Sequence, residues 1–213
     1  TYLLAVTNED GYSVPRICFA NKMDRTGADY WRTIQAIARR LGAHPVAVQM
    51  PIGTESNFRG VVDLIEQKAI LYCGAEHTEP EVAGVPEELL TEVARRREEM
   101  IERLAEADDD LAERYLAGEV LPPAELRAAL RRATLANKAV PVLCGTALRN
   151  KGIQLLLDAV IDYLPSPLDV PPLAGMDPDT GEPVACLADP EEPAVALVFK
   201  INTDPYIGRL AYL

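Results

Sequence analysis

The sequence lacks any apolar run approaching the ~18 residues that a membrane-spanning helix needs. It also lacks the charged-then-apolar opening that marks a signal peptide. Positive charge is in short supply, because 21 Lys and Arg stand against 33 Asp and Glu, for a formal net charge of −12. The first absence leaves no segment suited to a membrane-spanning helix, and the shortage of positive charge argues against a generic basic nucleic-acid-binding surface. The first residue is Thr1 rather than Met, so we expect a processed chain or an excerpt of a longer protein.

Cysteine and histidine are scarce as well. The sequence has 4 cysteines and 2 histidines, all far apart and with no C-x-x-C pair. Zinc is usually held by four ligands delivered as closely spaced pairs. The sequence therefore predicts no metal site. Cys18 and Cys144 lie inside apolar runs, where a free thiol behaves as a small core hydrophobe. This pattern fits a reducing environment and a cytoplasmic location.

The negative charge that is present is unevenly distributed. Residues 76–125 carry 16 acidic and 5 basic side chains, so nearly all of the net charge of −12 falls in this stretch. A shift in composition of this size indicates an inserted subdomain. Start signals near Pro86, Asp109 and Pro123 predict three helices here. Arg127, Arg131 and Arg132 fall near one face of the third helix, which is either a solvated surface or a docking site for a protein partner.

The segments on either side of this stretch alternate between short apolar runs and amphipathic ones. We predict strands at 15–20, 45–50, 60–65 and 139–144, and helices at 28–41 and 153–164. Residues 167–193 are rich in Pro, Asp and Gly, which is typical of a linker with turns. Residues 194–201 and 208–213 alternate like paired strands.

Two short segments carry the chemistry. They are Asn21-Lys22-Met23-Asp24 and, after Gly145, Thr146-Ala147-Leu148. Each follows an apolar strand and precedes a helix, which is where open α/β sheets bind their ligands.

The residue types of the first segment suit a guanine base. Guanine presents N1–H and an amino group side by side, and the Asp24 carboxylate can accept from both. Adenine lacks this donor pair and would leave the carboxylate partly unpaired. The stem of Lys22 can lie across the base, and Asn21 can tie the base edge to neighbouring loops. The N–H of Ala147 can donate to guanine O6, while Thr146 braces the loop.

Longer stretches around both segments resemble the elongation factor G family of translational GTPases. The resemblance is carried by residues 19–29, 41–46, 49–53, 58–63, 141–152, 155–160, 162–169 and 200–210. It runs from about Val14 to the end, and residues 1–12 depart from it. Ribosomal-protection and peptide-release GTPases of the same superfamily are alternatives, but the residues from Asn21 to Asp29 favour elongation factor G.

The resemblance implies an α/β fold with a mostly parallel, Rossmann-like sheet, as in a partial P-loop GTPase. In this layout residues 1–41 and 138–165 form the C-terminal half of the GTPase domain. Residues 42–137 form an inserted α+β G′ subdomain. Residues 166–213 form a linker and the first strands of a β-barrel, domain II.

The resemblance also implies a function. The whole protein would bind GTP and GDP with Mg²⁺ and hydrolyse GTP to move tRNA and mRNA through the ribosome. Asn21, Lys22, Met23 and Asp24, together with Thr146, Ala147 and Leu148, would bind the nucleotide. The sequence has no G-x-x-x-x-G-K-[ST] phosphate loop, so we expect no catalytic residue, no Mg²⁺ ligand and no GTPase activity from this chain alone.

The expected partners follow from the same resemblance. They are ribosomal stalk proteins, through the G′ insert, and ribosomal RNA, through domain II. An alternative is a non-catalytic module that only docks on a stalk protein. Because the sheet would lack its early strands, apolar edges would be exposed and the chain would tend to self-associate.

Overall fold

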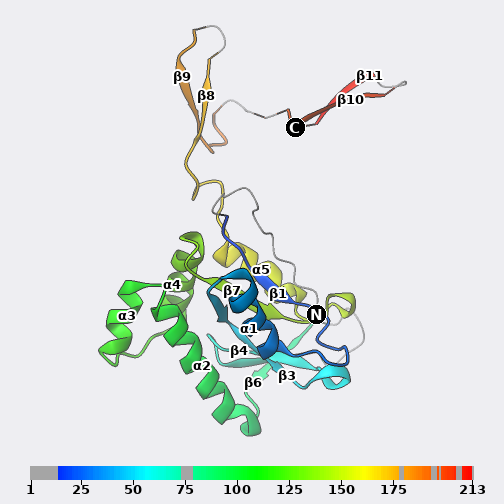
Figure 1. Ribbon diagram of the computed structural model, residues 1–213, viewed down its shortest axis with the longest axis vertical. Coiled ribbons are helices and arrows are strands. Elements are labelled where there is room, and N and C mark those ends of the chain that lie inside the picture. The colour runs from blue at the N-terminus through cyan, green and yellow to red at the C-terminus, as the bar shows by residue number, and fades with distance from the viewer. Residues whose placement is uncertain are drawn as a thin grey trace. The chain divides into compact units, whose positions relative to one another are not determined.

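The computed structural model describes residues 14–72, 79–177, 180–192, 196, 198–204 and 208–212 (Figure 1). By its internal contacts the chain divides into two units, with the boundary between Leu164 and Pro165. Both predicted site segments lie in the first unit. Cys73 and His77 lie outside the described residues. Within the described part of the chain, no helix combines the length and the apolar character needed to cross a bilayer.

The centre of the first unit is a parallel three-stranded sheet. Its strands are β1 (Cys18–Ala20), β7 (Val140–Cys144) and β2 (Pro45–Ala47), in the order β1-β7-β2. Both neighbouring pairs are parallel. β1 and β7 lie side by side although they are far apart in the sequence, which is possible because parallel strands are joined by long crossover connections.

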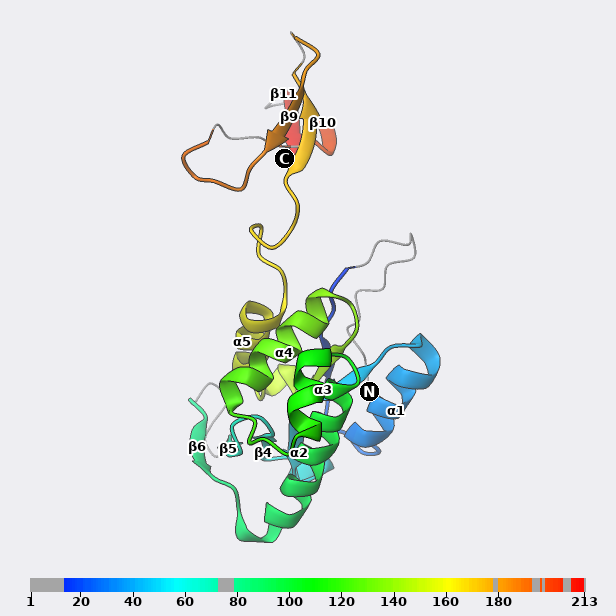
Figure 2. The same cartoon turned by 90° about the vertical axis from the view of Figure 1, so that its left-hand side faces the viewer.

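Helices cover the two faces of this sheet. They are α1 (Tyr30–Leu41) and α5 (Ile153–Tyr163). Cys18 and Val142 pack in one apolar cluster with Ile37 of α1, whereas Phe19 and Leu143 pack in another cluster with α5. Since successive side chains of a strand point to opposite faces, α1 and α5 lie on opposite sides of the sheet. Figure 2 shows the two helices on either side of the first unit.

A second, antiparallel sheet follows. It contains β3 (Gln49–Ile52), β4 (Gly60–Asp63), β5 (Lys68–Leu71) and β6 (Glu81–Gly84), in that order, with the 3₁₀ turn η1 (Glu55–Asn57) between β3 and β4. The prediction of one strand at 45–50 was wrong, because Val48 separates β2 from β3. Its N–H donates to Val142 O at 3.3 Å, and its carbonyl accepts from Leu64 N–H at 3.0 Å. Val48 thus joins the two sheets.

The acidic stretch is mainly helical, as its sequence predicts. It contains η2 (Glu87–Leu89), α2 (Leu90–Ala105), α3 (Asp109–Leu116) and α4 (Pro123–Leu135). The first helix starts as a 3₁₀ turn after Pro86. Asp108 caps α3 by accepting from Leu111 N–H at 3.0 Å. The apolar side of α2 and α4, including Val93, Leu104 and Leu126, is buried in one cluster with Phe19 and Leu143.

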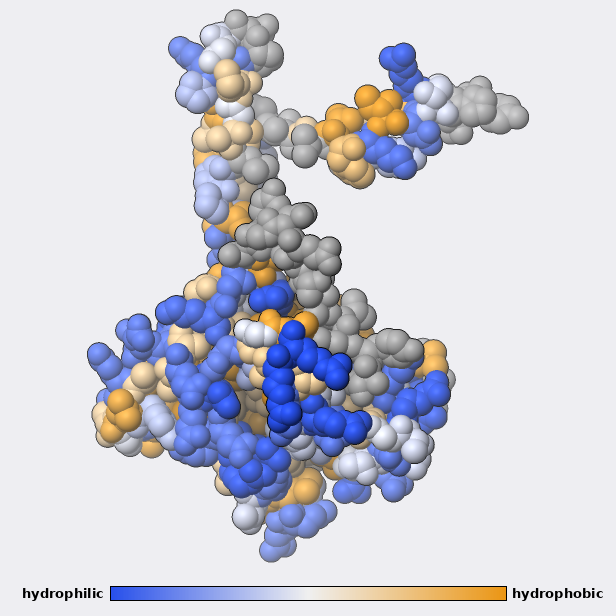
Figure 3. Space-filling model, in the orientation of Figure 1, coloured by the Kyte–Doolittle hydropathy of each residue, from blue (hydrophilic) through white to orange (hydrophobic). Residues whose placement is uncertain are grey.

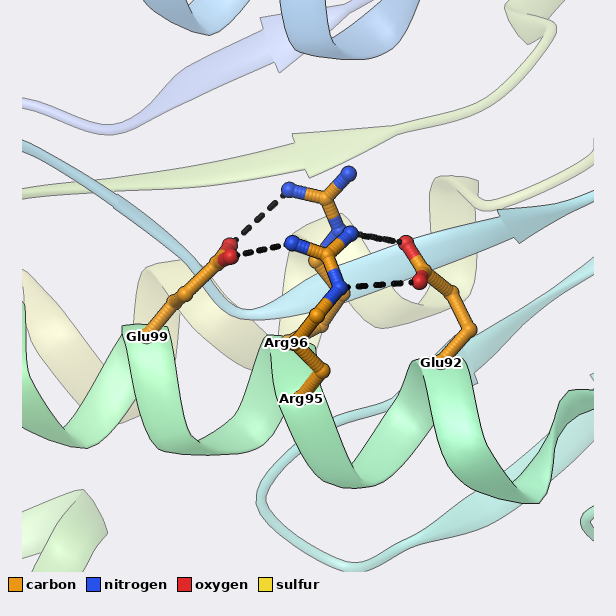
Figure 4. A network of polar contacts seen from close by, with 4 residues as sticks. All are labelled: Glu92, Arg95, Arg96 and Glu99. Atoms are coloured by element: carbon orange, nitrogen blue, oxygen red, sulfur yellow. Dashed lines mark hydrogen bonds and ion pairs between the residues drawn. The ribbon is translucent and has the colours of Figure 1, made fainter.

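A contact between α1 and α2 ties this helical stretch to the central sheet. The guanidinium carbon of Arg96 lies 3.5 Å from the ring centroid of Trp31. Glu92 and Glu99 pair with Arg96 and with Arg95 on the same helix (Figure 4). The face that carries α1 and α2 is mostly hydrophilic (Figure 3).

Among its described residues, the second unit contains two antiparallel hairpins. They are β8 (Leu173–Met176) with β9 (Pro183–Cys186), and β10 (Lys200–Asp204) with β11 (Gly208–Tyr212). The prediction of a linker over 167–193 was wrong in part, because β8 and β9 form a hairpin there. The predicted pairing of the last two strands is correct, but strand β10 begins at Lys200 rather than at 194. Their membership in a β-barrel stays a prediction.

Candidate functional site

Main-chain hydrogen bonds bring the two predicted segments together. Met23 N–H donates to Gly145 O at 3.1 Å, and Gly145 N–H donates to Ala20 O at 3.1 Å. The Met23 side chain is buried in the apolar cluster under α1. Both loops start where the parallel strands β1 and β7 end, so the sheet itself fixes their distance. Met23 therefore anchors the first loop to the apolar core and to the second loop.

Asn21 links the two loops through its side chain. Its Oδ1 accepts from Lys22 N–H at 2.8 Å and from Ala147 N–H at 3.0 Å. The sequence predicts that Ala147 N–H donates to guanine O6; in the structure this N–H donates to Asn21. Lys22 has a φ of 63°, a left-handed conformation that turns the chain sharply after β1.

Asp24 is held from the second loop. Its Oδ1 accepts from the Thr146 hydroxyl at 3.2 Å, and its Oδ2 lies 3.3 Å from Arg149 Nε. The side chain of Asp24 is 15% exposed, and Thr146 is buried. The sequence predicted Asp24 and Thr146 but missed Arg149.

The second loop is closed by main-chain hydrogen bonds. Thr146 and Lys151 exchange hydrogen bonds between N–H and carbonyl at 2.9 and 3.1 Å. Between them lie η3 (Ala147–Arg149) and Asn150, whose φ is 53°. A Cβ at Gly145 would lie 2.2 Å from Lys151 O, so only glycine fits where the loop leaves β7. Leu148 is exposed at the tip of this loop.

The groups gathered here fit a guanine base. An ionised carboxylate offers about four acceptor positions on two oxygens, and Thr146 and Arg149 occupy one on each. The remaining positions suit a pair of neighbouring N–H donors, which guanine has and adenine lacks. The exposed side chain of Leu148 and the half-buried stem of Lys22 supply apolar surface for the faces of a base.

Two cysteines lie buried in the strands behind the loops. Burial raises the pKa of the Cys18 thiol to about 11 and raises the pKa of Cys144 still further. Both residues are buried free thiols. Since the thiolate is the reactive form, both are inert core residues, as the sequence predicts. Among the residues described, no group of three His, Cys, Asp or Glu side chains could hold a metal ion.

The three arginines predicted on one face of α4 make contacts within the first unit. Arg127 lies 3.0 Å from Glu66. Arg132 donates two hydrogen bonds of 2.9 Å to Asp108. Arg131 Nη1 donates to three carbonyls at the end of α5. These contacts favour a structural role for all three over the docking role.

A cleft of about 320 Å³ lies elsewhere in the first unit, between α5 and strands β3 and β4. Asp63, Arg127 and Tyr163 are among its lining residues, and none of the predicted site residues is. Burial raises the pKa of Asp63 above its ordinary value. The cleft is therefore separate from the two loops.

Comparison with known proteins places the chain among GTP-binding proteins. A family model for the elongation factor Tu GTP binding domain matches residues 5–166. The match begins ahead of Val14, so the expectation that residues 1–12 depart from the family was wrong from residue 5 onward.

Individual relatives agree with the family match. Elongation factor G of Thermotoga maritima and of a second Thermotoga species are each 53% identical over 203 residues, which is 95% of this chain and 29% of those proteins. A crystal structure from Thermus thermophilus has a TM-score of 0.68 and 29% identity, covering 92% of this chain and 26% of that one. These similarities confirm the predicted fold class, an α/β protein consistent with a partial P-loop GTPase.

Proposed function

The chain belongs to the family of the elongation factor Tu GTP binding domain, and we propose that it forms the guanine-reading half of an elongation factor G GTPase domain. The observation that carries this proposal is the pairing of Asp24 with Thr146 and of Asn21 with Ala147. The chain spans 29% of the length of the curated relatives it matches, so the activity of the whole protein is part of the proposal.

Each predicted site residue has a role in this proposal, and that of Ala147 is to donate its N–H to Asn21. Asp24 accepts from guanine N1–H and the 2-amino group. Asn21 holds the two loops at a fixed distance, and Thr146 orients the carboxylate. Lys22 and Leu148 flank the base. Met23 supports the first loop from the core.

In the whole protein, GTP hydrolysis drives the movement of tRNA and mRNA through the ribosome in the cytoplasm. The backbone amides and the lysine of a phosphate loop, together with Mg²⁺, hold the phosphates in P-loop enzymes. The present sequence has no such G-x-x-x-x-G-K-[ST] loop. This chain therefore reads the base and hydrolyses no GTP by itself. The assignment of residues 1–41 and 138–165 to the GTPase domain, of 42–137 to the G′ insert and of 166–213 to domain II belongs to the same proposal.

A titration of the purified chain tests the proposal. GMP is expected to shift the NMR amide signals of both loops at millimolar concentration. AMP is expected to bind at least about tenfold more weakly, because it offers no pair of N–H donors for the remaining acceptor positions of Asp24. Asp24→Ala removes the preference, while the control Asp158→Ala, an exposed aspartate on α5, keeps it. Equal shifts with GMP and AMP contradict the proposed guanine recognition. GTP turnover above background contradicts the proposal that this chain hydrolyses no GTP by itself.

The second candidate function is a non-catalytic module that docks on a ribosomal stalk protein through residues 42–137. The observation that favours it is an exposed apolar surface at the end of α3 and in the segment after it. Leu116 and Val120 are 83% and 89% exposed there and lie close in sequence to acidic residues. A partner with a basic rim around an apolar centre suits such a surface. Contacts of the whole protein with ribosomal RNA through domain II complete this proposal.

Binding of the chain to a purified stalk protein distinguishes the two candidates. Docking is expected to weaken with salt and to be lost in Leu116→Ser, with Leu90→Ser on α2 as an exposed control. Unchanged binding in Leu116→Ser overturns this docking surface.

Self-association of the isolated chain is also proposed, since Leu157 and Ile161 of α5 are 59% and 76% exposed. Sedimentation over a range of protein concentrations tests it.

A further inference from the structure

Arg149 meets the carboxylate that the proposed function assigns to guanine recognition. Its Nε lies 3.3 Å from Asp24 Oδ2, while the Thr146 hydroxyl donates to Asp24 Oδ1 at 3.2 Å. The two oxygens of one carboxylate are therefore approached by two side chains of the same short loop. The side chain of Asp24 is 15% exposed and that of Arg149 is 51% exposed, so the pair lies at the mouth of the site.

The backbone around Arg149 is fixed. Its N–H donates to Thr146 O at 3.1 Å, and Asn150 N–H donates to Ala147 O at 3.0 Å. Asn150 then takes a φ of 53°, which returns the chain to Lys151 and the start of α5. Because the turn is closed in this way, the guanidinium reaches Asp24 from a defined direction.

A carboxylate needs two contacts to be held in one plane. The torsion that turns its oxygens is broad and roughly two-fold, so the Thr146 hydrogen bond alone leaves the plane free to rotate. A second contact at the other oxygen removes this freedom. Both oxygens still keep acceptor capacity for the two parallel N–H donors of guanine.

We propose that Arg149 is a positioning residue for guanine selectivity, which orients the Asp24 carboxylate by holding the oxygen that Thr146 does not reach. This inference rests on the proposed function of the two loops. The ion pair is half-exposed, and such pairs contribute little to folding stability. Selectivity should therefore respond to a change at Arg149 much more than stability does.

The test compares GMP with inosine monophosphate, which keeps N1–H but lacks the 2-amino group. Dissociation constants for both are measured by NMR titration of the ¹⁵N-labelled chain, and their ratio reports the second hydrogen bond to Asp24. We expect a ratio of about ten for the parent chain and about two for Arg149→Gln. Arg149→Lys restores part of the ratio because it keeps the charge. Because both dissociation constants are measured on the same preparation, a fraction of unfolded protein does not change their ratio.

The matched control is Arg25→Gln, which removes an exposed arginine directly after Asp24 and should leave the ratio unchanged. If the parent chain shows no shift with GMP, the proposed function and this inference both fall. If the parent chain prefers GMP but Arg149→Gln keeps the full ratio, only the inference falls. An equal drop in Arg25→Gln and Arg149→Gln also overturns it, because general electrostatics would then explain the effect.

Discussion

The side-chain oxygen of Asn21 accepts a hydrogen bond of 3.0 Å from the N–H of Ala147, across 126 residues of sequence. The same oxygen accepts from Lys22 N–H at 2.8 Å. One amide thus closes its own turn after β1 and joins it to the turn after β7. The relationship matters because the two loops are useful for base recognition only at a fixed separation.

Asn21→Ala is expected to destabilise the first unit by about 1 kcal/mol, since two backbone donors lose their acceptor at a half-buried position. Urea unfolding followed by the fluorescence of Trp31, the single tryptophan, measures the loss. The control Asn57→Ala, at an exposed position of η1, should change stability by less than about 0.5 kcal/mol. A loss in Asn57→Ala as large as in Asn21→Ala would contradict a specific role for the link.

Much of the fold follows from local signals in the sequence. The sequence predicts a helix over 28–41, and α1 does end at Leu41, with Gly42 at the C-cap and a φ of 58°. Asp29 caps the other end by accepting from Arg32 N–H. Caps of this kind depend on the residues of one turn only, so that they can be recognised without knowing the tertiary structure.

Features that depend on distant partners were not predictable in this way. The apolar run at 45–50 indicates a strand, but only its pairing with Val142 on one side and Leu64 on the other shows that it splits at Val48. Arg149 was missed for the same reason. The turn at Asn150 brings the side chain of Arg149 to Asp24, and no spacing in the sequence indicates this contact. That Asn21, Asp24 and Thr146 lie close together was predictable because their segments follow the ends of β1 and β7, and their role in binding guanine stays a prediction.

Asp108 is the basis of a pH prediction. Burial alone would raise its pKa, but hydrogen bonds from Arg132 and Leu111 N–H outweigh burial and lower the pKa below the ordinary value of 3.8. A carboxyl whose pKa is lowered on folding adds stability above its unfolded pKa and loses it as the pH falls.

Asp108→Asn keeps a capping acceptor but removes the charge. We expect it to cost about 1 kcal/mol at pH 7, and we expect the difference from the parent chain to shrink as the pH falls below about 4. Urea unfolding at several pH values measures the loss of stability at pH 7 and its decrease at low pH. Glu113→Gln on the exposed side of α3 is the control, with a smaller loss at pH 7. A difference that stays constant down to about pH 2 would show that charge plays no part.

Arg131 caps the end of α5 from α4. Its Nη1 donates to the carbonyls of Asp162 at 2.8 Å, Leu164 at 3.2 Å and Ile161 at 3.3 Å. These are carbonyls of the last turn of α5 and its C-cap, where a positive charge is favourable. We expect Arg131→Ala to destabilise the first unit by about 2 kcal/mol and Arg131→Lys by less.

Thermal unfolding of the three proteins measures this order. Arg103→Ala is a matched control, because Arg103 lies in an exposed ion pair with Glu106 at 3.2 Å and should cost less than about 0.5 kcal/mol. If Arg131→Ala is as stable as Arg103→Ala, the three carbonyls are equally well solvated by water and the capping role is wrong.

Arg96 and Arg95 are neighbours that share Glu92 and Glu99, yet only Arg96 lies against Trp31. Their side chains are 18% and 51% exposed. We expect Arg96→Met to cost about 1 kcal/mol, since it loses the contact with the ring along with its ion pairs, whereas Arg95→Met loses only exposed ion pairs and costs less than about 0.5 kcal/mol. The emission of Trp31 should change in Arg96→Met alone. Equal losses of stability, with unchanged emission in both variants, would mean that the ion pairs rather than the ring contact connect α2 to α1.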